Sequence, residues 1–206
     1  MQQRNPYEPT EASLGDASSP APETYPPGIL QYAGFWRRFG AFWIDALVLL
    51  PLSGVGYFFG EMTRMFYVYW LLPGLLIGLW FHVYLVGRYG GTPGKLLLKT
   101  RIAMVDGSAV TVKAAVLRYA VMFVLSVFSS VALTMSSLAM TDAQYFSLGY
   151  FARSQRLVET APSWYFGVNV LLQVWIWGEF VTMLFNKKRR AVHDFIAGTV
   201  VVRSPS

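Results

Sequence analysis

The sequence predicts an all-α membrane protein with four transmembrane helices, cytoplasmic termini and a small cytoplasmic β-hairpin. Hydrophobic residues make up 54% of the 206 residues and charged residues only 14%, whereas soluble domains carry about 25% charged residues. Four stretches are apolar and long enough to cross a bilayer, and the basic residues gather on one side of them. The chain has no cysteine and two histidines, so no disulfide framework, metal centre or other cofactor site is expected.

The first 34 residues differ from the rest of the chain. Residues 1–34 contain six prolines, are net acidic and have no apolar run. Such a segment cannot bury enough apolar surface to offset the entropy lost on ordering. It also lacks the basic start and apolar stretch of a secretory signal. We therefore expect a disordered, proline-rich cytoplasmic tail followed by a membrane domain over residues 35–203.

The four spans are expected at residues 39–59, 66–86, 114–140 and 164–185. A transmembrane helix needs about 20 mostly apolar residues, and each of these segments meets that length. The first two are joined by the short sequence GEMTRM, which allows only a helical hairpin. Residues 87–113 form the central loop, which connects spans two and three.

Basic residues set the expected orientation. Fourteen of them lie before span one, around the central loop or after span four, whereas Arg64, Arg153 and Arg156 lie on the other side. The positive-inside rule then places both termini and the central loop in the cytoplasm. In so apolar a chain this basic charge indicates contact with anionic lipid at the cytoplasmic face, and no nucleic-acid partner is expected.

The central loop is expected to form a hairpin. The β-prone runs RIAMV and SAVTV flank Asp106 and Gly107, a strong two-residue turn signal. The tail ends in TVVV, residues 199–202, which we expect to join the hairpin as a third strand; two independent segments are the alternative. The loop sequence GGTPGK lacks the residues of a phosphate-binding loop, so its glycines are expected to turn the chain, with Lys95 facing lipid.

Each span contributes one ionisable residue to the cytoplasmic third of the membrane. Counted from the basic residues or the span ends at 1.5 Å per residue, these four side chains lie at similar depth. They are Asp45, His82, Arg118 and Glu179. The outer half of the bundle is expected to offer only Asn169 and Gln173.

Two interpretations of this polar cluster are open. Isolated charges in hydrocarbon are costly, so the side chains should turn inward and pair, with Arg38 nearby. As a functional site, the cluster would bind a cation or relay protons, with His82 titrating and Asp45 or Glu179 as the cation ligand. As structural pairs, the same charges would fix helix packing without moving anything.

Three sequence motifs resemble those of the RDD family of bacterial membrane proteins, named for one arginine and two aspartates. The motifs are WRRFGAFWID, TPGK and HDFIAGTVVV, and the resemblance covers residues 32–203. It identifies the arginine as Arg38 and the two aspartates as Asp45 and Asp194. It implies a bacterial cytoplasmic-membrane location and transport, including sodium/proton exchange in some relatives. We expect Asp194 near Arg38 or Arg37, connecting the tail to span one; helix capping and simple solvation are the alternatives.

Two functions therefore remain after the sequence analysis. The first is a cation/proton exchanger or related small transporter, for which a homodimer is the expected working unit. The second is a non-transporting scaffold or accessory subunit. An enzyme is not expected, because the chain has no HExxH or GxSxG motif and no cysteine nucleophile.

Overall fold

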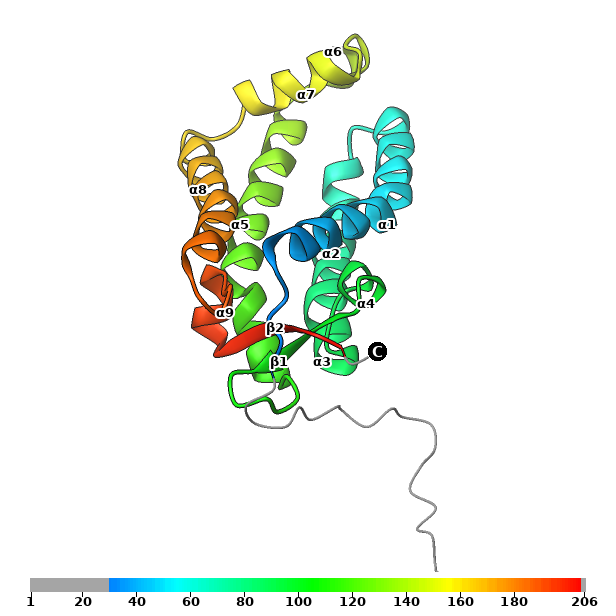
Figure 1. Cartoon of the computed structure of the whole chain (residues 1–206). Coiled ribbons are helices and arrows are strands. Elements are labelled where there is room, and N and C mark those ends of the chain that lie inside the picture. The colour runs from blue at the N-terminus through cyan, green and yellow to red at the C-terminus, as the bar shows by residue number, and fades with distance from the viewer. Residues whose placement is uncertain (1–29, 205–206) are drawn as a thin grey trace, which may run out of the picture.

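The computed structural model describes residues 30–204, and four helices in this range are long and apolar enough to cross a membrane. They are shown in Figure 1. The first is α1 (Phe35–Met62). The second is continuous through α2 (Phe66–Leu79), a π-helical turn η1 (Trp80–Tyr84) and α3 (Leu85–Tyr89). The third and fourth are α5 (Val112–Ala139) and α8 (Trp164–Phe185). All four predicted spans are confirmed as helices, and α1 begins four residues earlier than expected.

The outer surfaces of these helices are apolar. Large hydrophobic side chains such as Trp36, Phe166 and Phe185 are more than three-quarters exposed. In water so many exposed apolar groups would drive aggregation, whereas in a bilayer they contact acyl chains. The predicted proline-rich tail falls mostly in residues 1–29, outside the described residues.

A two-stranded antiparallel sheet lies at one end of the bundle. Strand β1 (Thr100–Met104) pairs with β2 (Thr199–Arg203), with Ile102 opposite Val201. The C-terminal strand thus joins the central loop, as expected. Short helices α4 (Pro93–Leu97) and α9 (Val192–Ala197) lie beside the sheet. We call this the sheet end of the molecule.

The second strand of the predicted hairpin, SAVTV, does not form in the described residues, so the sheet has two strands instead of three. The turn at Asp106 forms, since its carboxylate accepts the N–H of Ser108 at 2.9 Å. However, the chain that follows makes only one bridge to β1, at Ala109. Thr111 caps α5 by accepting the Ala114 N–H at 3.1 Å, so the helix begins before a strand can extend. On the opposite edge, Tyr32 bridges β2 instead.

The sheet packs on the bundle through a buried apolar cluster. Val86 of α3, Ile102 of β1, Ala115 of α5 and Val201 of β2 are all less than 4% exposed and in contact within this cluster. The Ala33 N–H also donates to the Val201 carbonyl at 2.9 Å. Both ends of the described chain are therefore fixed together at the sheet end.

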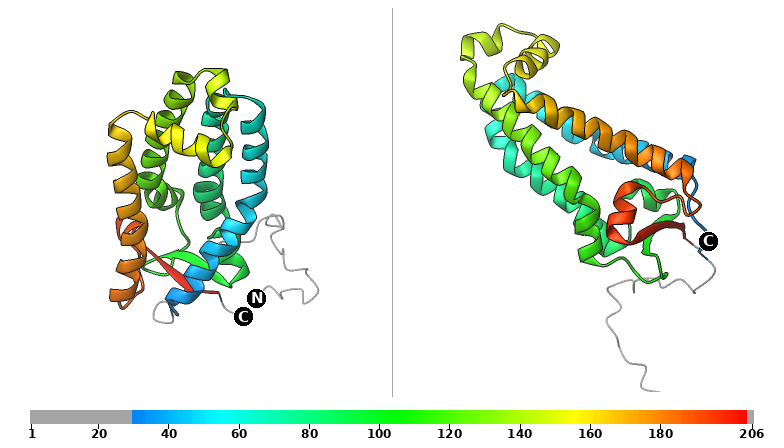
Figure 2. Two further views of the ribbon diagram at one scale, coloured as in Figure 1. Left: turned by 90° about the horizontal axis from the view of Figure 1, so that it is seen from above. Right: turned by 90° about the vertical axis from the view of Figure 1, so that its left-hand side faces the viewer.

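Two short helices that were not predicted cover the opposite end. They are α6 (Asp142–Phe146) and α7 (Tyr150–Glu159), and Figure 2 shows them far from the sheet. Thr141 and Gln144 form a reciprocal capping box that starts α6. Tyr145 and Leu157 are each 1% exposed and anchor these helices to the bundle. We call this the α7 end.

Candidate functional site

Asp194 of α9 is at the centre of a buried charge cluster at the sheet end. The side chain is 0% exposed. Its Oδ2 accepts hydrogen bonds from Arg38 Nη2 at 2.7 Å and from the Ala191 N–H at 2.9 Å. Its Oδ1 accepts from Thr199 Oγ1 at 3.1 Å and from Arg118 Nη1. The expected contact between Asp194 and Arg38 is confirmed, and it connects α9 to α1 and α5.

The cluster keeps Asp194 ionised. Burial alone would raise the pKa of its carboxyl group, but the charges of Arg118 and Arg38 outweigh burial and hold that pKa well below its usual range. Arg38 and Arg118 are 8% and 9% exposed, so each arginine depends on this carboxylate as its counter-ion. Asp194 is therefore a structural anion shared by two helices.

His193 extends the cluster to Glu179. Arg118 Nη2 lies 2.7 Å from His193 Nε2, and a guanidinium can only donate. The Nε2 atom is therefore the acceptor, which leaves the imidazole proton on Nδ1, in contact with Glu179 Oε2. Burial and the charge of Arg118 lower the pKa of His193, so the ring is neutral. The sequence analysis did not select His193; its position next to Asp194 was the available signal.

Asp45 has neutral partners and pairs with no arginine among the described residues. Its Oδ2 accepts from Thr92 Oγ1 at 2.6 Å and its Oδ1 from the Gly94 N–H at 2.7 Å. Helix α4 approaches α1 so closely that a Cβ at Gly94 would overlap the Ala41 carbonyl. The expectation that the charges of the cluster pair with one another was wrong for Asp45, because the TPGK loop supplies its hydrogen-bond donors instead.

The sheet-end cavity, about 240 Å³ in volume, lies between these two sets of contacts. Arg38, His82, Arg118 and Glu179 all line it, so four of the six predicted residues share one cavity. Asp45 and Asp194 lie behind its wall. Lys95 also lines it, and its Nζ donates to Thr92 at 3.2 Å, which corrects the expectation that it faces lipid. Whether these residues bind or move an ion stays a prediction.

Tyr119 of α5 lines both this cavity and a second one. The Tyr119 ring stacks on His82 with centroids 4.7 Å apart. Its hydroxyl lies so close to Gly78 of α2 that a Cβ there would overlap it. His82 itself belongs to the π-helical turn η1, and such turns occur frequently at functional sites. Tyr119 lines both cavities, so it is the side chain that they share.

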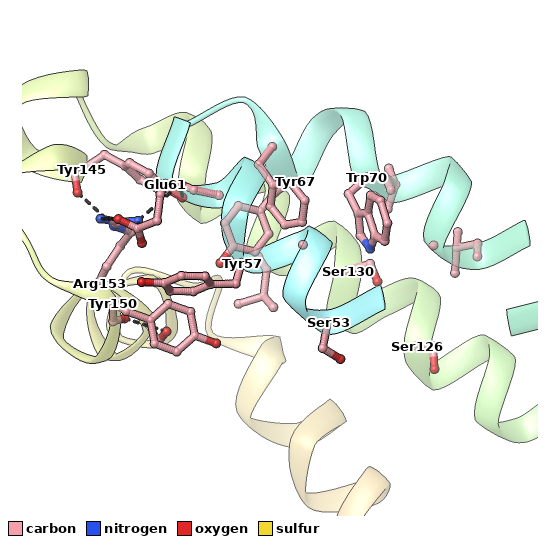
Figure 3. Close-up of a pocket in the computed structure, with 18 of the residues that line it drawn as sticks. Ser53, Tyr57, Glu61, Tyr67, Trp70, Ser126, Ser130, Tyr145, Tyr150 and Arg153 are labelled. Atoms are coloured by element: carbon pink, nitrogen blue, oxygen red, sulfur yellow. Dashed lines mark hydrogen bonds and ion pairs between the residues drawn. The ribbon is translucent and has the colours of Figure 1, made fainter. Parts of the chain in front are cut away.

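The α7-end cavity has a volume of about 440 Å³ and lies between α1, α2, α5 and α7. Figure 3 shows tyrosines, serines, Trp70 and one ion pair around it. Arg153 binds Glu61 through two contacts, at 2.8 and 3.3 Å. The expectation that the outer half offers only Asn169 and Gln173 was wrong, since Glu61, Arg153 and several serines and tyrosines line this cavity. Glu61 ends span one and Arg153 lies between spans, so counting depth within spans missed both.

Comparison with known proteins gives one result. The model of the RDD family matches residues 32–198. No curated protein and no solved structure matches the chain. The match covers most of the sequence, and it includes Arg38, Asp45 and Asp194 and all four apolar helices. The chain is a multi-pass integral membrane protein, and it belongs to the RDD family.

Proposed function

We propose that the protein is a small transporter that exchanges a cation for protons. The observation that carries this proposal is the pair of cavities, one at each end of the bundle, with Tyr119 lining both. A transporter needs a site that can open to either side in turn. Because Tyr119 lines both cavities, its movement would connect them and open the site to the other side of the membrane.

Glu179 is the residue that would couple the cation to the proton. It is the one acidic side chain among the residues that line the sheet-end cavity, where it contacts the neutral ring of His193. Three basic residues, Arg38, Lys95 and Arg118, line the same cavity. Protonation of Glu179 would remove the negative charge of the cavity lining, and the remaining positive charges would repel a cation. Cation and proton therefore compete for this carboxylate.

The proposal includes an orientation. The sheet end would face the cytoplasm of a bacterial cell, with the α7 end on the outer side. Thirteen of the sixteen basic residues in the described part of the chain lie in segments at the sheet end, and this excess favours the cytoplasmic side. Exposed side chains such as Lys187 and Lys188 would contact anionic lipid there.

A structural scaffold is the second candidate, and one specific observation favours it. Asp45 and Asp194, the two aspartates of the family pattern, have their buried carboxylates occupied by internal donors. Neither is among the residues that line the sheet-end or the α7-end cavity. Their contacts connect α1 to α4 and α9, which is a packing role. If every charge acted in this way, the protein would fold but carry nothing.

Flux measurement distinguishes the two candidates. Purified protein in liposomes with an internal pH-sensitive dye is given pulses of sodium or potassium. A transporter dissipates an imposed proton gradient, and Glu179→Gln abolishes that response while the protein remains folded. Glu159→Gln is the matched control, because Glu159 lies on α7 outside both cavities. Absence of cation-dependent flux in the wild type would support the scaffold.

A further inference from the structure

The α7-end cavity carries a binding chemistry of its own, which differs from that of the sheet-end cavity. Its wall contains six aromatic side chains that also carry a polar group: Tyr57, Tyr67, Trp70, Tyr119, Tyr145 and Tyr150. The rings of Tyr57 and Tyr150 meet edge to face, with centroids 5.2 Å apart. Figure 3 shows both rings on the same cavity as Glu61 and Arg153. Aromatic faces attract cations through the negative potential above each ring.

Arg153 cannot offer a hydrogen bond to an anion in this cavity. A guanidinium has five N–H donors, and all five are used. Nε donates to the Tyr145 carbonyl at 3.0 Å. Nη1 donates to the Gly60 carbonyl and to Glu61, and Nη2 to the Leu148 carbonyl and to Glu61. The positive charge is therefore neutralised and held at the wall. Arg153 is the one basic side chain among the residues that line the cavity, so no cationic donor is left there for a phosphate or carboxylate.

Glu61, by contrast, has hydrogen-bonding capacity left. Its carboxylate accepts two bonds from Arg153, whereas a carboxylate has about four acceptor positions. Its side chain is 38% exposed. An inorganic divalent ion would require several oxygen ligands, and Glu61 is the one carboxylate among the lining residues. One carboxylate and several aromatic faces match an organic ammonium ion better.

We propose that the α7-end cavity binds a small organic cation, an alkylammonium or quaternary ammonium compound, with its charged group against the aromatic faces and Glu61. Binding of this cation does not depend on the proposed function, whereas transport of it rests on that function. The volume of about 440 Å³ lies within the range of ligand pockets. Tyr119 lies at the inner limit of this cavity, so a bound cation would have access to the sheet-end cavity once that side chain moves.

Calorimetry on the full chain in detergent tests the binding. The probes are choline and its uncharged carbon isostere, dimethylbutanol, which has the same shape without the charge. We expect choline to bind and the isostere to bind at least about tenfold more weakly, the upper range of a desolvated cation–π contact. Trp70→Leu should weaken choline binding by a similar factor, while Trp70→Phe should restore most of it. Trp177→Leu is the control, because Trp177 is 65% exposed on the bundle surface.

Equal binding of choline and its isostere, or no heat from choline at millimolar concentration, overturns the proposal. So does a Trp177 variant that loses as much affinity as the Trp70→Leu variant. Thermal melting of each variant shows whether it is folded. If Trp70→Leu does not fold, the comparison of Trp70→Phe with the wild type still tests the proposal. Choline binding without any flux in liposomes leaves this proposal standing and contradicts the transport function instead.

Discussion

Replacing Asp194 with asparagine should destabilise the protein more than any change at an exposed ion pair. The substitution removes the negative charge while both Arg38 and Arg118 stay in place, 8% and 9% exposed. Removing one partner of a buried pair costs about 3–5 kcal/mol. Because the two arginines share one carboxylate, their losses do not add, and we expect one value in that range. For a chain of this length that corresponds to a fall in melting temperature of about 6–20 °C.

The measurement is thermal unfolding in detergent, followed by tryptophan fluorescence, with a matched aspartate as control. Asp142 also pairs with an arginine, Arg64, at 2.7 Å, but its side chain is 72% exposed. Exposed pairs contribute about 0–1 kcal/mol, so Asp142→Asn should lower the melting temperature by no more than about 4 °C. If the two variants melt at the same temperature, the buried cluster does not stabilise the fold and the reasoning fails.

Three further predictions follow from single residues. Gly94→Ala forces a methyl group onto the α1 backbone and should cost about 1–3 kcal/mol or more, whereas Gly54→Ala, with nothing within 4 Å, should be neutral in the same melting assay. The pKa of His193 is lowered from its usual 6.5, so below pH 6.5 the unfolded chain takes up a proton that the folded protein does not. The free energy of unfolding should therefore fall below pH 6.5 by up to about 1.4 kcal/mol per pH unit. His193→Asn should flatten this pH dependence of stability. Gly78→Ala should displace Tyr119 and change the liposome flux at least severalfold without a comparable loss of stability; unchanged flux would count against a role of Tyr119 in connecting the cavities.

The helices and the family pattern could be predicted from the sequence because each depends on local properties. An apolar run of about 20 residues becomes a transmembrane helix whatever its neighbours do. The contact between Asp194 and Arg38 was expected from the resemblance to the RDD family, which identifies both residues. The second strand of the hairpin, SAVTV, does not form for a local reason: the cap at Thr111 starts α5 too early.

The cavities could not be predicted, because the depth of a residue in the membrane does not tell which neighbouring helix its side chain faces. Counting residues along a span gives the height of a side chain, but not the direction it faces. Asp45 has the expected depth, yet it meets the Gly94 backbone, 49 residues away. Arg153 contacts Glu61, 92 residues away in the sequence. Both residues lie outside the four predicted spans, so the search for charges within those spans missed them. Contacts between distant segments decide which polar groups line a cavity.

Cysteine labelling tests most directly whether the two cavities belong to one transport route. The chain has no cysteine, so Met122→Cys places a single thiol in the sheet-end cavity, which Met122 lines. With a membrane-impermeant maleimide, the transport account predicts reaction from the sheet side at rest, and from the α7 side as well when a proton gradient drives the protein. A thiol that reacts only from the sheet side under every gradient and cation tested would contradict transport and leave a static bundle.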